Sequence, residues 1–152
     1  MTTATTTVPT ATKIALKKMT PDLAVKDVRR TIEFYRDVLG FEVRGMVPDS
    51  PDAERYDWAM VSREGVTLMF EPRGVEGPGA ASVAPSGDAL ILYTEVEGVE
   101  ALRAELDGKV EIVEDLHDTF YGTREFCFRD CNGYQISFSE DRSRGADESQ
   151  ED

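Results

Sequence analysis

The sequence has very few of the side chains that bind transition metals. Among 152 residues there is one histidine, His117, and there are two cysteines, Cys127 and Cys131, in a C-x3-C spacing with no second pair. A structural zinc site needs four ligands, mostly Cys and His, and two cysteines this close together do not build a disulfide framework. We therefore expect no zinc site and two reduced thiols.

Long apolar runs and an excess of basic residues are also absent. No apolar stretch approaches the roughly 20 residues of a membrane helix, so we expect no membrane association. Residues 1–12 have neither the basic start nor the apolar segment of a signal peptide, which favours the cytoplasm. The net charge of −13 argues against nucleic acid binding, which depends on Lys and Arg neutralising phosphates. A cationic ligand would be attracted instead, although a solvated surface and an acidic tail also explain much of this charge.

The composition divides the chain into two halves. We expect a disordered arm at 1–12, one domain at 13–140 and a disordered acidic tail at 141–152. Within the domain, a linker at 73–87 rich in Gly, Pro, Ser and Ala separates module one (13–72) from module two (88–140).

Each half has the same order of patterns. Apolar residues at steps of four, three and four from Val28 to Leu39 predict a helix, with Asp27 as its N-cap and Gly40 just after its end. A second, shorter helix is expected at 99–106. Alternation predicts strands at 13–25, 41–46, 56–62 and 66–71, and again at 90–96, 110–113, 123–129 and 134–139, with a loop at 114–122.

This order is an internal βαβββ repeat. A lone unit of that kind leaves one sheet face uncovered, so the two units are expected to pair. The sequence thus predicts an α+β protein whose two βαβββ modules curl around a shared cleft.

Two blocks carry a family likeness. LAVKDVRRTIEFYRDVLGF (23–41) and DTFYGTREFCFRDCNGYQISF (118–138) resemble the opening and closing signatures of the vicinal oxygen chelate superfamily, which includes glyoxalases, bleomycin-resistance proteins and ring-cleaving dioxygenases. The likeness spans roughly residues 18–140. It implies the glyoxalase/bleomycin resistance fold and a homodimer, but it says little about function because one scaffold hosts unrelated activities.

The resemblance also places the family's metal-binding positions. In its metalloenzymes, four side chains, typically His, Gln or Glu, hold a divalent ion, and the matching positions here are Thr20, Leu68 or Met69, Ile91 and Ser137. Hydroxyls, an alkane and a thioether do not replace imidazole and carboxylate as ligands. We expect no metal, no other cofactor and no catalytic residue, which makes the chain most similar to the metal-free bleomycin-resistance branch.

Strand alternation independently predicts the wall of the cleft. If Leu23 and Val25 belong to the core, the alternate residues face the cleft. Trp58, Phe120 and Tyr121 are added as aromatic candidates, although core packing suits Trp58 slightly better and packing under the loop suits the other two equally well. The residues expected to contact a ligand are Asp22, Trp58, Met69, Glu71, Ile91, Tyr93, Glu95, Phe120, Tyr121, Glu125, Cys127, Gln135 and Ser137.

These residues support two main hypotheses. The first is a metal-independent protein that sequesters a cationic or aromatic small molecule, such as an antibiotic, because carboxylates and aromatic faces both bind cations. The second is a metal-dependent lyase, epimerase or extradiol-type dioxygenase that uses Glu71, Glu95, Glu125 and His117 as unconventional ligands. A small-molecule sensor or biosynthetic accessory protein is not separable from the first. The carboxylates could also be only the solvated side of an open sheet.

Overall fold

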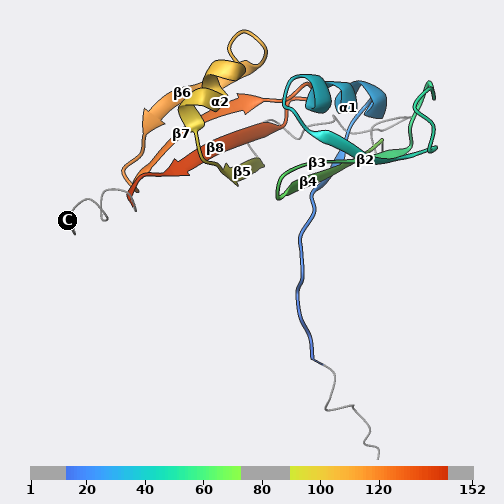
Figure 1. Cartoon of the computed structure of the whole chain (residues 1–152), viewed down its shortest axis with the longest axis horizontal. Helices are drawn as coiled ribbons and strands as arrows, with labels where there is room; N and C mark the ends of the chain where they lie inside the picture. The colour runs from blue at the N-terminus through green and yellow to red at the C-terminus, as the bar shows by residue number, and fades with distance from the viewer. Residues whose placement is uncertain (1–12, 73–89, 144–152) are drawn as a thin grey trace, which may run out of the picture.

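The computed structural model describes residues 13–72 and 90–143, which form two four-stranded sheets with one helix each (Figure 1). The first module contains β1 (Asp22–Ala24), α1 (Val28–Asp37), β2 (Glu42–Val47), β3 (Trp58–Arg63) and β4 (Val66–Glu71). The second contains β5 (Ile91–Glu95), α2 (Val99–Glu105), β6 (Glu111–Asp118), β7 (Thr123–Arg129) and β8 (Gln135–Asp141). The predicted α+β architecture of two βαβββ modules is confirmed. No helix in the described ranges is long and apolar enough to cross a membrane.

The two sheets have the same topology. Their strand orders are β1-β4-β3-β2 and β5-β8-β7-β6. In each sheet the first strand pairs in parallel with the last, and the other pairs are antiparallel. Strands β1 and β5 are therefore edge strands. Both helices lie on one side of the sheets, and no described helix or strand covers the opposite face, here called the open face, of either sheet (Figure 1).

Helix α1 follows the predicted pattern. Its buried residues Val28, Ile32 and Tyr35 pack against the first sheet, where Phe70 is fully buried. The N-cap Asp27 accepts a hydrogen bond from the backbone N–H of Arg30 at 3.0 Å. The chain then leaves the helix through Gly40, whose φ of +74° is readily available only to glycine. The predicted helix and its Asp27 cap are confirmed, but the helix ends at Asp37, two residues before the predicted Leu39, and its C-cap is Val38.

The turn between β7 and β8 fastens module two to module one. The hydroxyl of Tyr35 donates to Oδ2 of Asp130 at 2.6 Å, and the amide of Asn132 donates to Oγ1 of Thr31 at 3.0 Å. Tyr134 donates to the carbonyl of Ala24 at 2.7 Å. The stretch RDCNGY (129–134), which is part of the second block that carries the family likeness, is thus an intermodule joint.

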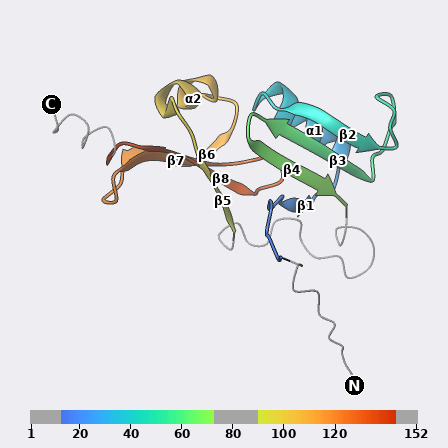
Figure 2. The ribbon, with the colours of Figure 1, turned by 60° about the horizontal axis from the view of Figure 1, so that its bottom comes forward.

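Several predicted boundaries were wrong. The first strand comprises only residues 22–24, and residues 13–20 extend away from the sheets (Figure 2). The predicted loop 114–122 is mostly part of β6, which is an edge strand with two register irregularities and so lacks a regular apolar alternation. Asp141 ends β8 rather than beginning a tail, and Leu90, predicted as the first residue of a strand, lies just before β5 and is 44% exposed. The predicted arm 1–12, the linker 73–87 and the tail beyond residue 143 lie outside the described residues.

Candidate functional site

The open face of the second sheet carries polar side chains in ordered rows. Strand pairing places Ser139 opposite both Glu95 and Glu125, and Glu125 opposite His117. A second row is Tyr93, Ser137, Cys127 and Glu114, and a third is Ile91, Gln135, Arg129 and Glu111. Phe126 and Phe128, which alternate with Glu125 and Cys127, are fully buried on the helix side. The alternation predicted for this sheet is therefore confirmed at these positions.

Glu125 is the centre of a hydroxyl network. It is only 7% exposed, and it accepts hydrogen bonds from Tyr121 at 2.7 Å, Thr123 at 2.9 Å and Tyr93 at 3.2 Å. The Tyr93 hydroxyl also lies 2.8 Å from Oγ of Ser139. Burial raises the pKa of Glu125, but the hydrogen bonds from these hydroxyls outweigh it and lower the pKa below its ordinary value. Glu125 is therefore a fixed negative charge at neutral pH.

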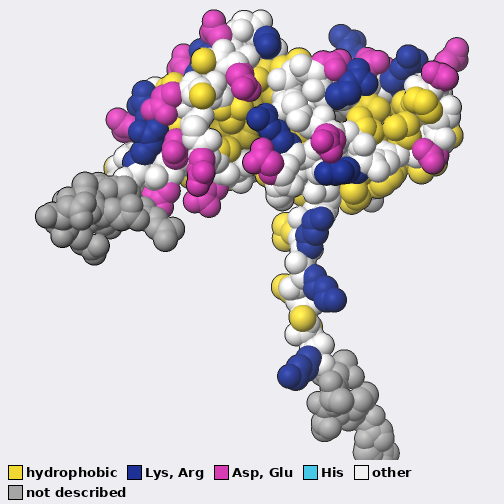
Figure 3. Space-filling view, viewed as in Figure 1, with side chains coloured by type: hydrophobic (Ala, Val, Ile, Leu, Met, Phe, Trp, Pro, Cys, Tyr) yellow, Lys and Arg dark blue, Asp and Glu magenta, His cyan; other side chains and the backbone are white. Residues whose placement is uncertain are grey.

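A hollow of about 440 Å³ lies over this network. Its walls are Tyr93, Glu95, Tyr121, Thr123, Ser139, Asp141 and Ser143. Phe120 is almost fully exposed beside it and meets the Tyr121 ring edge-to-face at 5.0 Å between centroids. Acidic side chains also gather along the lower side of module two in the space-filling view (Figure 3). The arrangement offers negative charge and aromatic faces to one ligand, which suits a cation with an apolar part.

The open face of the first sheet is more apolar. Ala59 and Val61 are fully buried under α1, so Trp58 and Met60 lie on the opposite face. The Trp58 ring covers Gly45, where an added Cβ would lie 3.3 Å from ring atom Cζ3. The preference for Trp58 as a core residue was wrong. All four residues of this stretch are apolar, so hydrophobicity could not choose the face, and the small Ala59 fits beneath the helix.

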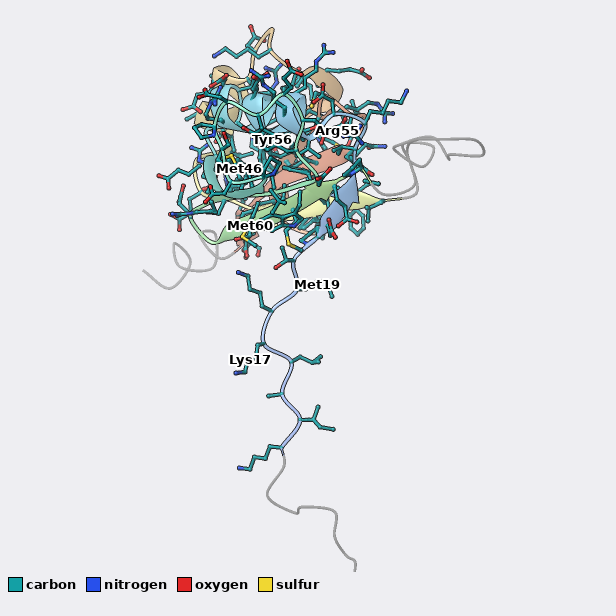
Figure 4. All side chains as sticks on the ribbon, turned by 90° about the vertical axis from the view of Figure 1, so that its right-hand side faces the viewer. Lys17, Met19, Met46, Arg55, Tyr56 and Met60 are labelled. Carbon is teal, nitrogen blue, oxygen red and sulfur yellow. The ribbon has the colours of Figure 1, made fainter. Side chains whose placement is uncertain are left out.

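The first sheet shows which of Leu68 and Met69 lies on the open face of β4. Leu68 is buried in the core, whereas Met69 pairs with Asp22 on β1 and with Met60 on β3. Met69 and Met60 therefore share the open face, and Figure 4 shows Met60 on the side from which the segment with Lys17 and Met19 leaves. The family's metal position on β4 corresponds to a thioether.

The side chains at the family's metal positions do not fit a divalent metal. Thr20, Met69, Ile91 and Ser137 provide two hydroxyls, a thioether and an alkane. Glu71 lies on the first sheet, whereas Glu95, Glu125 and His117 lie on the second, so the alternative ligand set is divided between two sheets. Within residues 13–72 and 90–143, no three His, Cys, Asp or Glu side chains are grouped closely enough to hold a metal ion.

His117 and Cys127 have other partners. The His117 Nε2 lies 3.1 Å from Oε1 of Glu114, and its Nδ1 lies 2.8 Å from the carbonyl oxygen of Asp115. The Cys127 thiol donates to Oε1 of Gln135 at 3.4 Å, and burial raises its pKa. A thiol held in its protonated form is a poor nucleophile.

The structure separates the predicted ligand contacts into two groups. Tyr93, Glu95, Tyr121 and Glu125 meet around the hollow, with Ile91, Cys127, Gln135 and Ser137 further along the same face and Phe120 at its rim. Asp22, Trp58, Met69 and Glu71 belong to the first sheet. The sequence prediction omitted Thr123, Ser139, Asp141 and Ser143. Thr123, Ser139 and Asp141 continue the alternation of Glu125 and Ser137, so the strand-alternation rule could have identified them. The roles of all these residues in binding stay predictions.

The chain is similar in sequence and fold to known proteins. A family model described as Glyoxalase/Bleomycin resistance protein/Dioxygenase superfamily matches residues 15–138. TioX from Micromonospora sp. ML1 is 22% identical with a TM-score of 0.62, over 82% of this chain and 95% of that one. The bleomycin-binding protein of bleomycin-producing Streptomyces verticillus, complexed with copper(II)-bleomycin, is 23% identical with a TM-score of 0.58, over 83% and 97%.

A glyoxalase/bleomycin resistance protein/dioxygenase from Nocardioides is 19% identical with a TM-score of 0.63, over 84% of this chain and 85% of that one. A search of curated proteins gave no match. At these identities the three structures show only that the fold is shared, and what they bind is a property of those proteins.

Proposed function

Because this chain belongs to the Glyoxalase/Bleomycin resistance protein/Dioxygenase superfamily, we propose that it uses that scaffold as a metal-independent binding protein that sequesters a cationic, partly aromatic small molecule. The observation that carries the proposal is the buried, ionised Glu125 beneath a hollow walled by Tyr93 and Tyr121. Sequestration needs affinity and no chemistry at the ligand.

The charges act at two ranges. A net charge of −13 attracts a cation from a distance and speeds its encounter with the protein. Inside the hollow, Glu125 is shielded from water, so a cation there is screened less than at the surface. The exposed Glu95 on β5 adds a second negative charge to the wall. Each cation–aromatic contact contributes about 0.5–2 kcal/mol.

An antibiotic is a fitting ligand for this hollow. The similarity to the bleomycin-binding protein of Streptomyces verticillus supports it, since that protein is known in complex with copper(II)-bleomycin. In this proposal the chain protects a cell by binding the drug, and antibiotic resistance is its biological role. The two thiols, Cys127 and Cys131, are free, which is consistent with work in the cytoplasm.

The working form in this proposal is a homodimer. The helices cover one side of the sheets, and the open faces carry Trp58, Met60 and Met69 on the first sheet and Ile91 and Tyr93 on the second. Burying such faces in a second copy removes apolar surface from water.

Calorimetric titration with bleomycin, both metal-free and copper-loaded, tests the proposal. We expect one binding site per chain, and we expect Glu125→Gln to weaken binding at least tenfold, because the substitution removes the fixed charge. The matched control is Glu105→Gln, which makes the same charge change at an exposed position of α2, on the other side of the sheet.

A thermal-shift screen of other cationic aromatic compounds extends the test. A ligand at about 100 times its dissociation constant adds roughly 2.7 kcal/mol of stability. Absence of binding across cationic antibiotics would refute sequestration. A stoichiometric divalent metal held by the purified protein would favour the enzyme hypothesis instead.

A further inference from the structure

The negative charge beneath the hollow is enclosed by hydroxyl groups. Glu125 accepts a hydrogen bond from Tyr121 at Oε1 and one from Thr123 at Oε2, at 2.7 and 2.9 Å. The Tyr93 hydroxyl lies 3.2 Å from Oε2, and Ser139 also hydrogen-bonds to this carboxylate. A carboxylate offers about four lone-pair positions to donors. The four hydroxyls surround both oxygens, so an N–H group of a ligand finds no open acceptor position on Glu125.

The hydroxyl oxygens themselves are engaged with one another. The Tyr93 hydroxyl lies 2.8 Å from Oγ of Ser139, and Oγ1 of Thr123 lies 2.7 Å from Oγ1 of Thr119. A cation with N–H groups gives up hydrogen bonds to water when it enters such a site, and a buried donor without an acceptor is costly. An ammonium or guanidinium group would therefore lose hydration above Glu125 without regaining its hydrogen bonds.

The other carboxylates of the hollow stay in water. Glu95 and Asp141 are exposed residues of its wall. Oδ1 of Asp141 accepts from the backbone N–H of Ser143 at 3.0 Å and from its hydroxyl at 2.7 Å. Ion pairs with exposed carboxylates contribute little, because both partners remain hydrated. These two residues attract cations in general and do not distinguish one kind of cation from another.

Aromatic rings supply the remaining attraction. Tyr93 and Tyr121 are 56% and 51% exposed, and both line the hollow. The Phe120 ring meets Tyr121 at an interplanar angle of 88°. The face of such a ring attracts a cation without needing an N–H donor. A cation whose charge is covered by methyl groups has no hydrogen bond to lose, so the rings and the enclosed charge favour it.

We propose that the hollow selects fully alkylated cations, such as a quaternary ammonium group on a partly aromatic molecule, over cations that carry N–H groups. The methylated head lies against the rings of Tyr93 and Tyr121, and Glu125 acts on it through space rather than through a hydrogen bond. A hollow of about 440 Å³ has room for the head and an attached ring. This inference rests on the proposed function and narrows the chemical class of its ligand.

NMR titration of the isotope-labelled chain with two matched probes tests the selection. Benzyltrimethylammonium and benzylammonium carry the same ring and the same charge, and they differ only in the groups on nitrogen. We expect the first to bind at least roughly tenfold more tightly, because it leaves no donor unpaired. Its amide shifts should fall on β5 and β7 around Tyr93 and Glu125. Glu125→Gln should weaken its binding at least tenfold, and Glu105→Gln should leave it within twofold.

Tyr121→Phe tests the hydroxyl enclosure directly. The variant keeps the ring and removes the donor to Oε1 of Glu125, so an acceptor position opens towards the hollow. We expect benzylammonium to bind at least threefold more tightly to this variant than to the wild type. General damage to the site does not produce a gain of binding. The matched control is Tyr56→Phe, whose hydroxyl donates to the carbonyl of Ser50 in the first module, and it should leave both probes within twofold.

The outcomes separate this inference from the proposed function. Equal binding of the two probes, tighter binding of benzylammonium, or no gain in Tyr121→Phe would overturn the selection and leave a cation-binding hollow. Binding of bleomycin without binding of either probe would overturn the selection and leave sequestration intact. Selective binding of benzyltrimethylammonium by a protein that binds no antibiotic would support the selection and refute the antibiotic. Absence of binding by both probes and by cationic antibiotics would overturn both.

Discussion

Replacing Tyr35 by Phe isolates the hydrogen bond on which the intermodule joint depends. Tyr35 is fully buried, so the substitution keeps the ring packed and removes only the hydroxyl that donates to Oδ2 of Asp130 at 2.6 Å. Asp130 is 5% exposed, and its other oxygen, Oδ1, keeps the backbone N–H groups of Asn132 and Tyr134 at 2.9 Å each. In the variant, the buried Asp130 carboxylate keeps the hydrogen bonds to Oδ1 and loses the one to Oδ2.

The expected cost follows from that geometry. Hydrogen bonds to charged groups contribute about 1.5–3 kcal/mol, and a buried acceptor left unsatisfied loses its full desolvation penalty. We therefore expect Tyr35→Phe to lower the free energy of unfolding by about 2–3 kcal/mol, or roughly 5–10 °C in melting temperature for a chain of this size. Tyr121→Phe removes a hydroxyl that donates to the Glu125 carboxylate from a half-exposed position, so it should lower the free energy of unfolding by less than Tyr35→Phe does.

The pH dependence gives a second test. Burial raises the pKa of Asp130, and the Tyr35 hydrogen bond opposes this, so removing the hydroxyl raises the pKa further. A carboxyl whose folded pKa lies above its unfolded value loses stability as pH rises through the interval between them. The deficit of Tyr35→Phe should accordingly be larger at pH 7 than at pH 4, measured by urea unfolding at both. A deficit below about 0.5 kcal/mol, or one that grows in acid, would refute this account of the joint.

Three further outcomes are expected. Glu125 has a lowered pKa, so its contribution to stability is present at neutral pH and is lost as pH falls below about 4.3; the stability difference between wild type and Glu125→Gln should shrink in urea titrations towards pH 3, whereas Glu105→Gln should show no such trend. Gly40→Ala forces a side chain onto φ +74° and places its Cβ 3.2 Å from Nη1 of Arg63, so it should destabilise by about 1–2 kcal/mol in thermal unfolding. Asp27→Ala removes the α1 cap and should cost about 1 kcal/mol, and an unchanged melting temperature would contradict the role given to that carboxylate.

The sequence predicted the fold best where one physical pattern acted alone. In α1 the apolar spacing, the N-cap and the glycine after the helix agree, and all are found. On β7 and β8, aromatic residues at 126, 128 and 138 alternate with polar ones, so the buried face was unambiguous. The likeness of the two halves added the topology, because a repeated βαβββ pattern leaves few ways to pair the strands.

The errors occurred where tertiary contacts decide. Trp58, Ala59 and Met60 are all apolar, so only the packing of α1 selects which of them it covers. The edge strand β6 carries Glu114, Asp115 and His117 and has a polar character that sequence alone cannot separate from a loop. Lys13–Met19 has the alternation of a strand but no partner among the described strands, and strand assignment requires one.

The candidate site was predicted in part, because strand alternation gives the face of a side chain but not its tertiary contacts. Alternation placed Tyr93, Glu95 and Glu125 on one face. The register pairs both glutamates with Ser139, and a hydrogen bond joins Tyr93 to Ser139. Ser139 continues the alternation of Gln135 and Ser137 but was not among the predicted ligand contacts, and Asp141 was assigned to the tail because charged composition continues past the strand. The repeat already assigned the predicted wall residues to two modules, but strand parity fixes only the face of a side chain and not the neighbours that it meets on that face.

The joint between the modules uses a Tyr of the first half and an Asp of the second half, and the equivalent positions do not repeat this pair. Asp130 of the second half reaches Tyr35 of the first, whereas the repeat aligns Tyr35 with Leu106 and Asp130 with Ser62, which reproduce neither the phenol nor the carboxylate. Two halves that share a topology are therefore not exchangeable. A chain made of two second halves would have Leu106 in place of Tyr35, so no phenol hydroxyl would donate to Asp130. A chain made of two first halves would have Ser62 in place of Asp130, so no carboxylate would accept from Tyr35.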